Sequence, residues 1–185
     1  MVSEIPGRPP PSGTIAAMAL RLRPLRDEDE AVARRAHAEL AVDDFEFLLD
    51  WESGERWRSY LVRLENRRHG IDLPPDRVRG AFLVAVAGSE IVGRVSIRFE
   101  LNDFLENFGG HVGYCVRPGH RRQGFAREIL RQALVIARAE GVDRVLVTCD
   151  EDNLPSARAI EANAGVLEDI RAEPDGTDKR RYWID

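Results

Sequence analysis

Apolar and polar residues recur along this chain in patterns that predict a mixed α/β fold. Period-two alternation predicts a first strand, and short apolar runs bounded by turn residues predict buried strands. Strands are expected over residues 20–25, 81–87, 90–101, 111–117, 142–149, 166–172 and 180–184. Gly88-Ser89 is typical of a hairpin turn between the second and third of these segments.

Helical spacing of apolar residues predicts helices over residues 27–41, 54–68, 125–140 and 155–163. Asp27-x-x-Glu30 resembles a capping box at the start of the first one. In the third, Ile129, Ala133 and Ala137 share one face, which predicts packing against a sheet. Residues 102–110 are expected to form a loop. The resulting order is β-α-α-β-β-β-α-β-α-β-β.

A basic, glycine-bearing loop joins the strand at 111–117 to the helix at 125–140. The first N–H groups of a helix lack intrahelical acceptors and the helix dipole favours negative charge there, so this loop predicts a phosphate or pyrophosphate site. Gly124 lets the backbone approach a ligand closely. The candidate anion-binding residues are Arg121, Arg122, Gln123, Gly124, Phe125, Ala126 and Arg127. Neither a P-loop nor a dinucleotide-binding glycine motif is present.

Composition and charge favour a single globular domain. The chain has 185 residues, 43% hydrophobic and 32% charged, with a net charge of −5. We expect one domain over residues 19–185 behind a flexible Pro- and Gly-rich tail at 1–18, with Met1 or Met18 as the start. The negative charge argues against nucleic-acid binding, and no apolar run suggests a membrane span. Two isolated cysteines predict a reducing cytoplasm, with no disulfide and no metal site.

The loop sequence Arg121-x-x-Gly124-x-Ala126 resembles the acyl-CoA pyrophosphate loop of the GNAT family of N-acetyltransferases. The similarity extends over roughly residues 20–185, to a bacterial subgroup of predicted acetyltransferases without an assigned substrate. The segments that carry it are 100–104, 107–114, 147–156 and 181–184. The resemblance implies an α/β (α+β) fold whose mixed, mostly antiparallel sheet is flanked by helices. Two central parallel strands, ending near Val116 and Cys149, would splay apart.

The resemblance also implies acetyl-CoA as cosubstrate. The backbone at Tyr114 and Val116 would face the pantetheine arm, and amides from Arg122 to Arg127 would hold the pyrophosphate. Asn153 and Ser156 match positions that often contact the CoA arm; Asn153 is alternatively a helix N-cap, and both roles can hold together.

Two residues are candidate bases for deprotonating an amine. His111 begins the donor-binding strand and has an ordinary pKa suited to proton transfer, and Glu100 ends the preceding strand. Each is alternatively a structural or solvated side chain.

The general acid is a separate question. Family members often have a tyrosine that protonates the thiolate at the position where this chain has Ile160. Tyr114 or Tyr182 would replace that tyrosine, or the thiolate would leave unaided.

The sequence therefore predicts an acetyl-CoA-dependent N-acetyltransferase that transfers the acetyl group directly to a primary amine. The acceptor is left open among a small molecule, an amino acid and a peptide, and a homodimer is possible. The alternative is a non-catalytic module that senses acyl-CoA.

Overall fold

The computed structural model describes residues 20–185, so the tail expected at 1–18 and the start at Met18 lie outside the described residues. One seven-stranded sheet has the order β1-β2-β3-β4-β5-β7-β6, and β4 and β5 are its parallel neighbours. The other neighbouring strands pair antiparallel, as predicted. The strands are β1 (Leu20–Arg23), β2 (Gly80–Ala87), β3 (Glu90–Arg98), β4 (Val112–Val116), β5 (Val145–Asp150), β6 (Val166–Ala172) and β7 (Asp178–Ile184).

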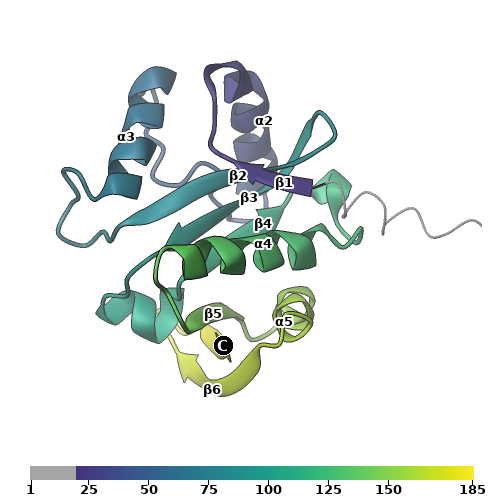
Figure 1. Ribbon diagram of the computed structural model, residues 1–185. Coiled ribbons are helices and arrows are strands. Elements are labelled where there is room, and N and C mark those ends of the chain that lie inside the picture. The colour runs from purple at the N-terminus through teal and green to yellow at the C-terminus, as the bar shows by residue number, and fades with distance from the viewer. Residues whose placement is uncertain (1–19) are drawn as a thin grey trace, which may run out of the picture.

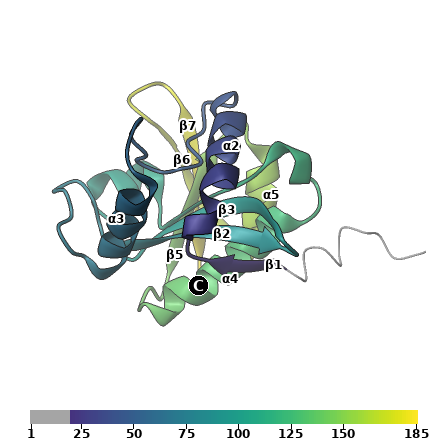
Figure 2. The same ribbon diagram turned by 90° about the horizontal axis from the view of Figure 1, so that it is seen from above.

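Helices cover both faces of this sheet, as Figure 1 shows. Helices α2 (Glu30–Ala41) and α3 (Trp57–His69) lie on one face, and Figure 2 shows α2 over β2 and β3. Helices α4 (Phe125–Ala139) and α5 (Leu154–Glu161) lie on the other face. Among residues 20–185, no helix is long and apolar enough to cross a membrane. We call the two sides the α2/α3 face and the α4/α5 face.

Each face has its own hydrophobic core, because successive side chains of a strand point to opposite sides of the sheet. Phe82, Val84 and Val86 of β2 pack with residues of α2 and α3. The alternate residues Ala81, Leu83 and Ala85 belong to the core that includes α4 and α5. The central strands of the sheet are therefore buried on both faces, which fixes their register and the direction of the side chains along them, whereas the edge strand β6 is largely exposed.

The structure corrects several predicted boundaries. The expected capping box at Asp27 and Glu30 does not form. Instead, the buried carboxylate of Asp29 accepts a hydrogen bond from the Arg26 N–H at 2.8 Å and pairs with the Arg23 guanidinium. A carboxylate there satisfies an N–H at the helix start while it neutralises a neighbouring cation.

Other elements also differ from the sequence prediction. Helix α3 begins at Trp57 rather than at residue 54. Strand β3 ends at Arg98, so Glu100 lies beyond the strand in which it was expected. The loop predicted at 102–110 contains a short π-helical turn, η2 (Leu105–Gly109), and β5 begins three residues later than expected. Boundaries are the least certain part of a pattern-based assignment because element ends depend on tertiary contacts.

Candidate functional site

Strands β4 and β5 are joined at one end only. Their parallel ladder contains a single residue pair, Val112 opposite Val147. Next to it, the His111 N–H donates to the Leu146 carbonyl at 2.7 Å, and a Cβ on Gly110 would come within 2.8 Å of that same oxygen. Beyond this closed end the strands separate, which confirms the predicted splayed pair. We call the space between the separated parts of β4 and β5 the wedge.

The pairing of β4 with β3 decides which backbone groups face the wedge. The Arg98 N–H donates to the His111 carbonyl at 2.7 Å, and the Arg117 N–H donates to the Val92 carbonyl at 2.9 Å. In an antiparallel pair, alternate residues direct both backbone groups to the same neighbour. Odd-numbered residues of β4 therefore bond to β3, and the backbone groups of Tyr114 and Val116 point toward the wedge. These polar groups need partners that β5 does not provide.

The loop between β4 and α4 has the backbone shape of an anion-binding concavity. A turn at Pro118–His120 is followed by Arg122 with φ +62° and by Gly124 with φ +84°. Successive right- and left-handed backbone conformations turn neighbouring N–H groups toward one point. Gly124 is also the N-cap of α4, and the first helical hydrogen bond runs from the Glu128 N–H to its carbonyl. The N–H groups of residues 125–127 therefore precede the hydrogen-bonded part of the helix.

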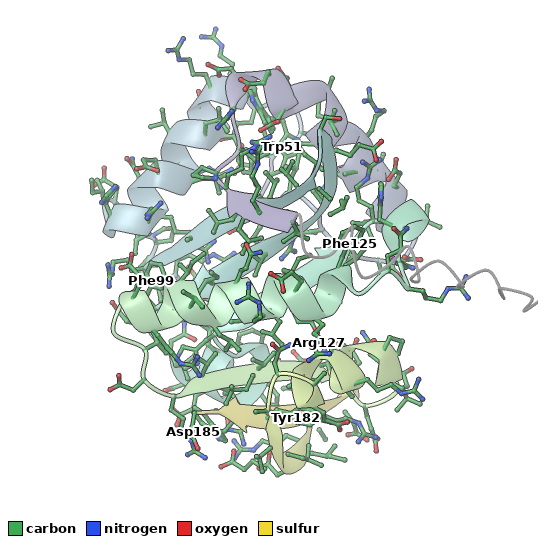
Figure 3. All side chains as sticks on the ribbon, turned by 45° about the vertical axis from the view of Figure 1, so that its right-hand side comes forward. Trp51, Phe99, Phe125, Arg127, Tyr182 and Asp185 are labelled. Carbon is green, nitrogen blue, oxygen red and sulfur yellow. The ribbon has the colours of Figure 1, made fainter. Side chains whose placement is uncertain are left out.

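The side chains of this loop differ in their roles. Phe125 is buried in the core of the α4/α5 face and anchors the start of the helix. Arg122 and Arg127 are exposed, and Gln123 and Ala126 are partly exposed. Arg127 lies on the side of α4 that faces α5, where the Asn163 side chain donates to its carbonyl at 3.1 Å (Figure 3). The two exposed arginines are therefore placed to add positive charge around the loop.

Arg121 is held by other groups. Its guanidinium donates to the Val116 carbonyl at 3.2 Å and pairs with Asp43 at 2.6 Å. These contacts direct Arg121 toward the segment after α2. They fix the loop against β4.

Helix α5 borders the wedge at the end of β5. Asn153 is its N-cap, and its side-chain oxygen accepts a hydrogen bond from the Ser156 N–H at 3.2 Å. The Ser156 hydroxyl forms a 2.9 Å hydrogen bond with the Tyr114 hydroxyl, which links β4 to α5. Burial raises the pKa of Tyr114 to about 12. The phenol therefore keeps its proton at neutral pH and can donate a hydrogen bond beside the wedge.

His111 is a buried contact between the two strands. Only 6% of its surface is exposed, and its Nδ1 accepts a hydrogen bond from the Leu146 N–H at 2.9 Å. Burial, together with the nearby positive charge of Arg98, lowers the pKa of His111 to about 4. The imidazole is therefore neutral at pH 7, with its proton on Nε2, and it holds the closed end of the wedge together.

Glu100 lies apart from this arrangement. Its side chain is 63% exposed, and its carboxylate lies 3.8 Å from Arg79, whose guanidinium also contacts Glu140. Glu140 directly follows α4, and Figure 3 shows Phe99 and Phe125 at opposite ends of that helix. Glu100 is thus placed as a surface ion pair at the end of α4 that is remote from the anion loop.

The structure shows whether Ile160 and three aromatic residues between residues 45 and 57 are buried or accessible. Ile160, at the position of the family's tyrosine, is fully buried in the core of the α4/α5 face. Phe47 and Trp57 are also buried, so they are core residues. Phe45 instead stacks on the guanidinium of Arg94, with 4.6 Å between the guanidinium carbon and the ring centroid.

The sequence reasoning missed Arg94 and Arg98 of β3. Their signal was present, because two arginines at i and i+4 interrupt an otherwise apolar strand on the same face. Both lie on the α2/α3 face beside Gly113 of β4.

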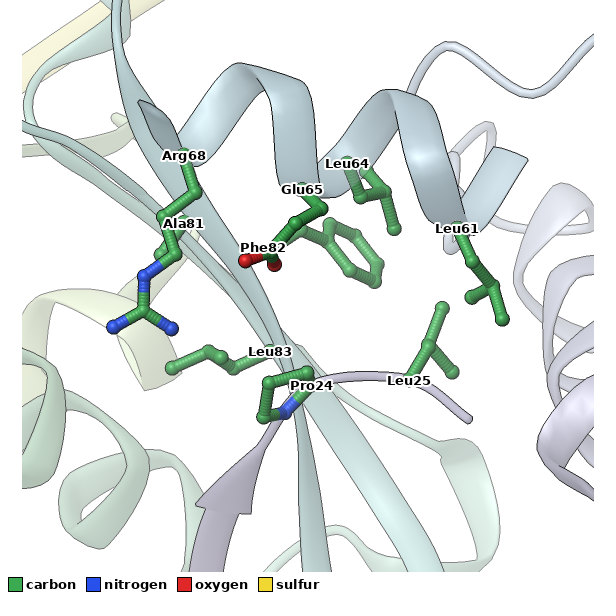
Figure 4. A pocket seen from close by; sticks show the side chains of 9 residues that line it. All are labelled: Pro24, Leu25, Leu61, Leu64, Glu65, Arg68, Ala81, Phe82 and Leu83. Carbon is green, nitrogen blue, oxygen red and sulfur yellow. The ribbon is translucent and has the colours of Figure 1, made fainter. Parts of the chain in front are cut away.

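Two other hollows lie in the structure, one on the α2/α3 face and one beside the end of β5. The first, of about 50 Å³, separates α3 from β1 and β2 and has room for no more than a few water molecules (Figure 4). Its lining is Pro24, Leu25, Leu61, Leu64, Glu65, Arg68, Ala81, Phe82 and Leu83. The second is open and lies beside the end of β5, where Asp150, Asp152 and Asp178 would repel a diphosphate. Neither hollow suits an acyl-CoA.

Comparison with known proteins identifies the same architecture. The family model described as "Acetyltransferase (GNAT) domain" matches residues 19–165. No curated protein sequence matches the chain significantly.

Solved structures with this fold include three acetyltransferases. RimJ of Mycobacterium smegmatis, in complex with CoA-disulfide, has a TM-score of 0.64 at 22% identity, covering 89% of this chain and 81% of that one. The putative acetyltransferase yncA of Salmonella typhimurium, with its cofactor acetyl-CoA, has a TM-score of 0.61 at 15% identity, covering 90% and 94%. A Salmonella typhimurium enzyme that modifies the N-terminal serine of ribosomal protein L7/L12 has a TM-score of 0.64 at 19% identity, covering 90% and 96%.

Proposed function

The chain belongs to the GNAT family of acetyltransferases, and we propose that it transfers an acetyl group from acetyl-CoA directly to a primary amine. The observation that carries this proposal is the open wedge between β4 and β5 with an anion-binding loop at its mouth. The family membership makes the chain an acyltransferase. The donor, the acceptor class and the roles of individual residues are the content of the proposal.

The residues around the wedge fit an acetyl-CoA molecule. The backbone amides of residues 122–127 and the side chains of Arg122 and Arg127 would hold the diphosphate. The backbone groups of Tyr114 and Val116 would pair with the pantetheine amides, because β5 leaves them without ladder partners, although the Val116 carbonyl also accepts a hydrogen bond from Arg121 at 3.2 Å. Ser156 and Asn153 would line the arm at the start of α5.

The reaction has a simple balance. The neutral amine nitrogen attacks the thioester carbon, a C–N bond forms, the C–S bond breaks, and the amine loses one proton. A backbone N–H of β4 that points into the wedge would stabilise the negative charge on the carbonyl oxygen. We propose that the Tyr114 hydroxyl, hydrogen-bonded to Ser156, donates a proton to the departing thiolate. Tyr114 thus takes the role that Ile160 cannot perform.

We propose that His111 acts mainly as a positioning residue. With a pKa of about 4 its imidazole is a weak base, and its Nδ1 already accepts the Leu146 N–H. The base roles of His111 and Glu100 remain predictions, which pH–rate profiles of single variants at these residues test. A rate limb that persists unchanged in each single variant and in the double variant would assign the amine proton to water.

The accepting amine belongs either to a peptide N-terminus or to a smaller molecule. The similar enzyme that modifies the N-terminal serine of L7/L12 supports testing peptide α-amino groups first. Cys115 and Cys149 are both free thiols, which supports a reducing cytoplasmic location.

A coupled assay of thiol release tests the proposed function. Acetyl-CoA is incubated with the protein and a panel of peptides, amino acids and simple amines, and the acetylated product is measured by mass spectrometry. We expect release of CoA that depends on both the amine and the enzyme. Tight CoA binding by calorimetry with no turnover for any amine would instead favour the sensor function, and absence of CoA binding would refute the site.

A further inference from the structure

Two arginines occupy the α2/α3 face of the sheet at the closed end of the wedge. Arg94 is 4% exposed, and its guanidinium donates to the carbonyls of Gly113 at 3.1 Å and Glu46 at 2.7 Å. The Phe45 ring covers it from the other side. Arg94 thus joins β3, β4 and the segment after α2 in one cationic unit.

The Arg98 guanidinium forms fewer short hydrogen bonds than that of Arg94. Its Nη1 donates to the carbonyls of Gly109 and Gly110 at the long distances of 3.2 and 3.4 Å. A Cβ on Gly113 would lie 3.3 Å from Nη1 and 3.8 Å from Nη2, so the guanidinium lies directly over this glycine. Within residues 20–185, no carboxylate forms an ion pair with Arg98. Its Nη2 and Nε therefore remain available for a ligand.

The surrounding charges leave the region strongly positive. Arg67 and Arg77 both pair with one carboxylate, that of Asp50, at 3.1 and 2.6 Å. Because Arg77 also lies 3.7 Å from Asp76, the four arginines Arg67, Arg77, Arg94 and Arg98 form ion pairs with only two carboxylates among residues 20–185. Burial and the positive charges of the other three arginines lower the pKa of Arg98 to about 10, which leaves it charged at pH 7. A bound anion would relieve this repulsion.

The position of Arg98 relates it to the reaction. Gly113 follows Val112, which is the one residue of β4 paired with β5, so the guanidinium lies where the wedge begins. Tyr114 and Val116 pack against the core of the α4/α5 face, whereas Cys115 packs against that of the α2/α3 face. Since the donor loop belongs to α4, the arginines lie on the opposite face, from which an acceptor amine can approach.

We propose that Arg98, supported by Arg94, binds a carboxylate of the acceptor, so that the preferred substrate is an amine that carries a carboxylate close to its nitrogen. This inference rests on the proposed acetyl transfer. A guanidinium and a carboxylate form charge-assisted, bidentate hydrogen bonds, which fix orientation as well as affinity. The same positive field disfavours the ammonium form of the amine and thereby assists its deprotonation.

The test compares matched acceptors with matched variants. Steady-state kinetics are measured for an amino acid and its carboxamide, and for two peptides that differ only by Asp or Asn at the second residue. The enzymes are wild type, Arg98→Gln, Arg98→Lys and the control Arg58→Gln, which removes an exposed arginine of α3. CoA affinity and thermal midpoint are measured for each variant to establish that it folds.

We expect wild type to prefer the carboxylate-bearing member of one pair by about 10- to 100-fold in kcat/KM, the usual effect of a charged hydrogen bond. Arg98→Gln should remove this preference, Arg98→Lys should restore part of it, and Arg58→Gln should keep it. The pair that shows the effect distinguishes a free amino acid from an acidic peptide.

Two results would overturn the inference while the proposed function stands. One is turnover of amines with no preference for the carboxylate, and the other is an equal loss for both members of a pair in Arg98→Gln. Absence of turnover with every amine would refute the proposed function itself, and the inference with it. Should Arg98→Gln fail to fold, Arg98→Lys and the wild-type substrate preference still decide the question.

Discussion

Acidification should destabilise this protein through His111. The folded state keeps the imidazole neutral, because burial lowers its pKa to about 4, whereas in the unfolded chain the pKa returns to its ordinary value near 6.5. Between these values the unfolded chain binds a proton that the folded protein excludes. Stability therefore falls as the pH decreases from about 6.5 toward 4.

The size of the effect follows from these two pKa values. The linkage relation gives a loss of about 2 kcal/mol at pH 5 and about 3 kcal/mol at pH 4, relative to pH 7.5. A loss of this size is a large fraction of the stability of a typical domain. The loss accumulates between the two pKa values and then stays constant, since well below pH 4 both states bind the proton.

The assay is urea denaturation at several pH values for wild type and for His111→Asn. The asparagine oxygen can accept the Leu146 N–H in place of Nδ1 but does not titrate in this range. The difference between the two stability curves therefore isolates His111 from the carboxylates. We expect the curves to converge by about 2 kcal/mol between pH 7.5 and pH 5. Parallel curves across this window would show that the folded protein accommodates a charged imidazole, and the assigned burial would be wrong.

Three further predictions concern the loop, the wedge and the first helix. Gly124→Asp should reduce CoA affinity by at least 10-fold in calorimetry, because it places a negative charge at the N-terminus of α4; unchanged affinity would remove the loop from the site. Tyr114→Phe should lower kcat by about 10- to 100-fold while CoA affinity is retained, because it removes the hydroxyl that contacts Ser156; an unchanged kcat would exclude it as an acid. Asp29→Ala should cost about 3 kcal/mol in chemical denaturation, because Arg23 would lose its buried partner; a cost below 1 kcal/mol would contradict this.

Much of the fold was predictable because its elements follow local rules. The strong apolar periodicity of the helix at 125–140 and the hairpin at Gly88-Ser89 gave the right elements within a few residues. The loop at 118–127 combines proline, glycine and arginines in an order that depends only on its own sequence. Its left-handed residues Arg122 and Gly124 agree with the anion site expected there.

The candidate catalytic residues were harder to predict, because their chemistry depends on neighbours remote in sequence. His111 was expected to have an ordinary pKa, but the Leu146 backbone and the sheet bury it. Glu100 was expected at a strand end beside the acceptor, but the strand stops two residues earlier and the side chain meets Arg79. The role of Arg98 emerges only when Gly113 and Asp50 are placed around it.

Because β4 and β5 share a single residue pair, the sheet consists of two groups of strands, here called leaves, that are joined at one end. Four strands form the first leaf and three form the second, and among residues 20–185 the strands of the two leaves pair only at Val112 and Val147. A ligand that lies between the leaves adds cross-links that the chain alone does not make. If the proposed cosubstrate binds there, its occupancy should raise the resistance of this protein to unfolding, so the half-life of the protein should follow the supply of acyl donor around it.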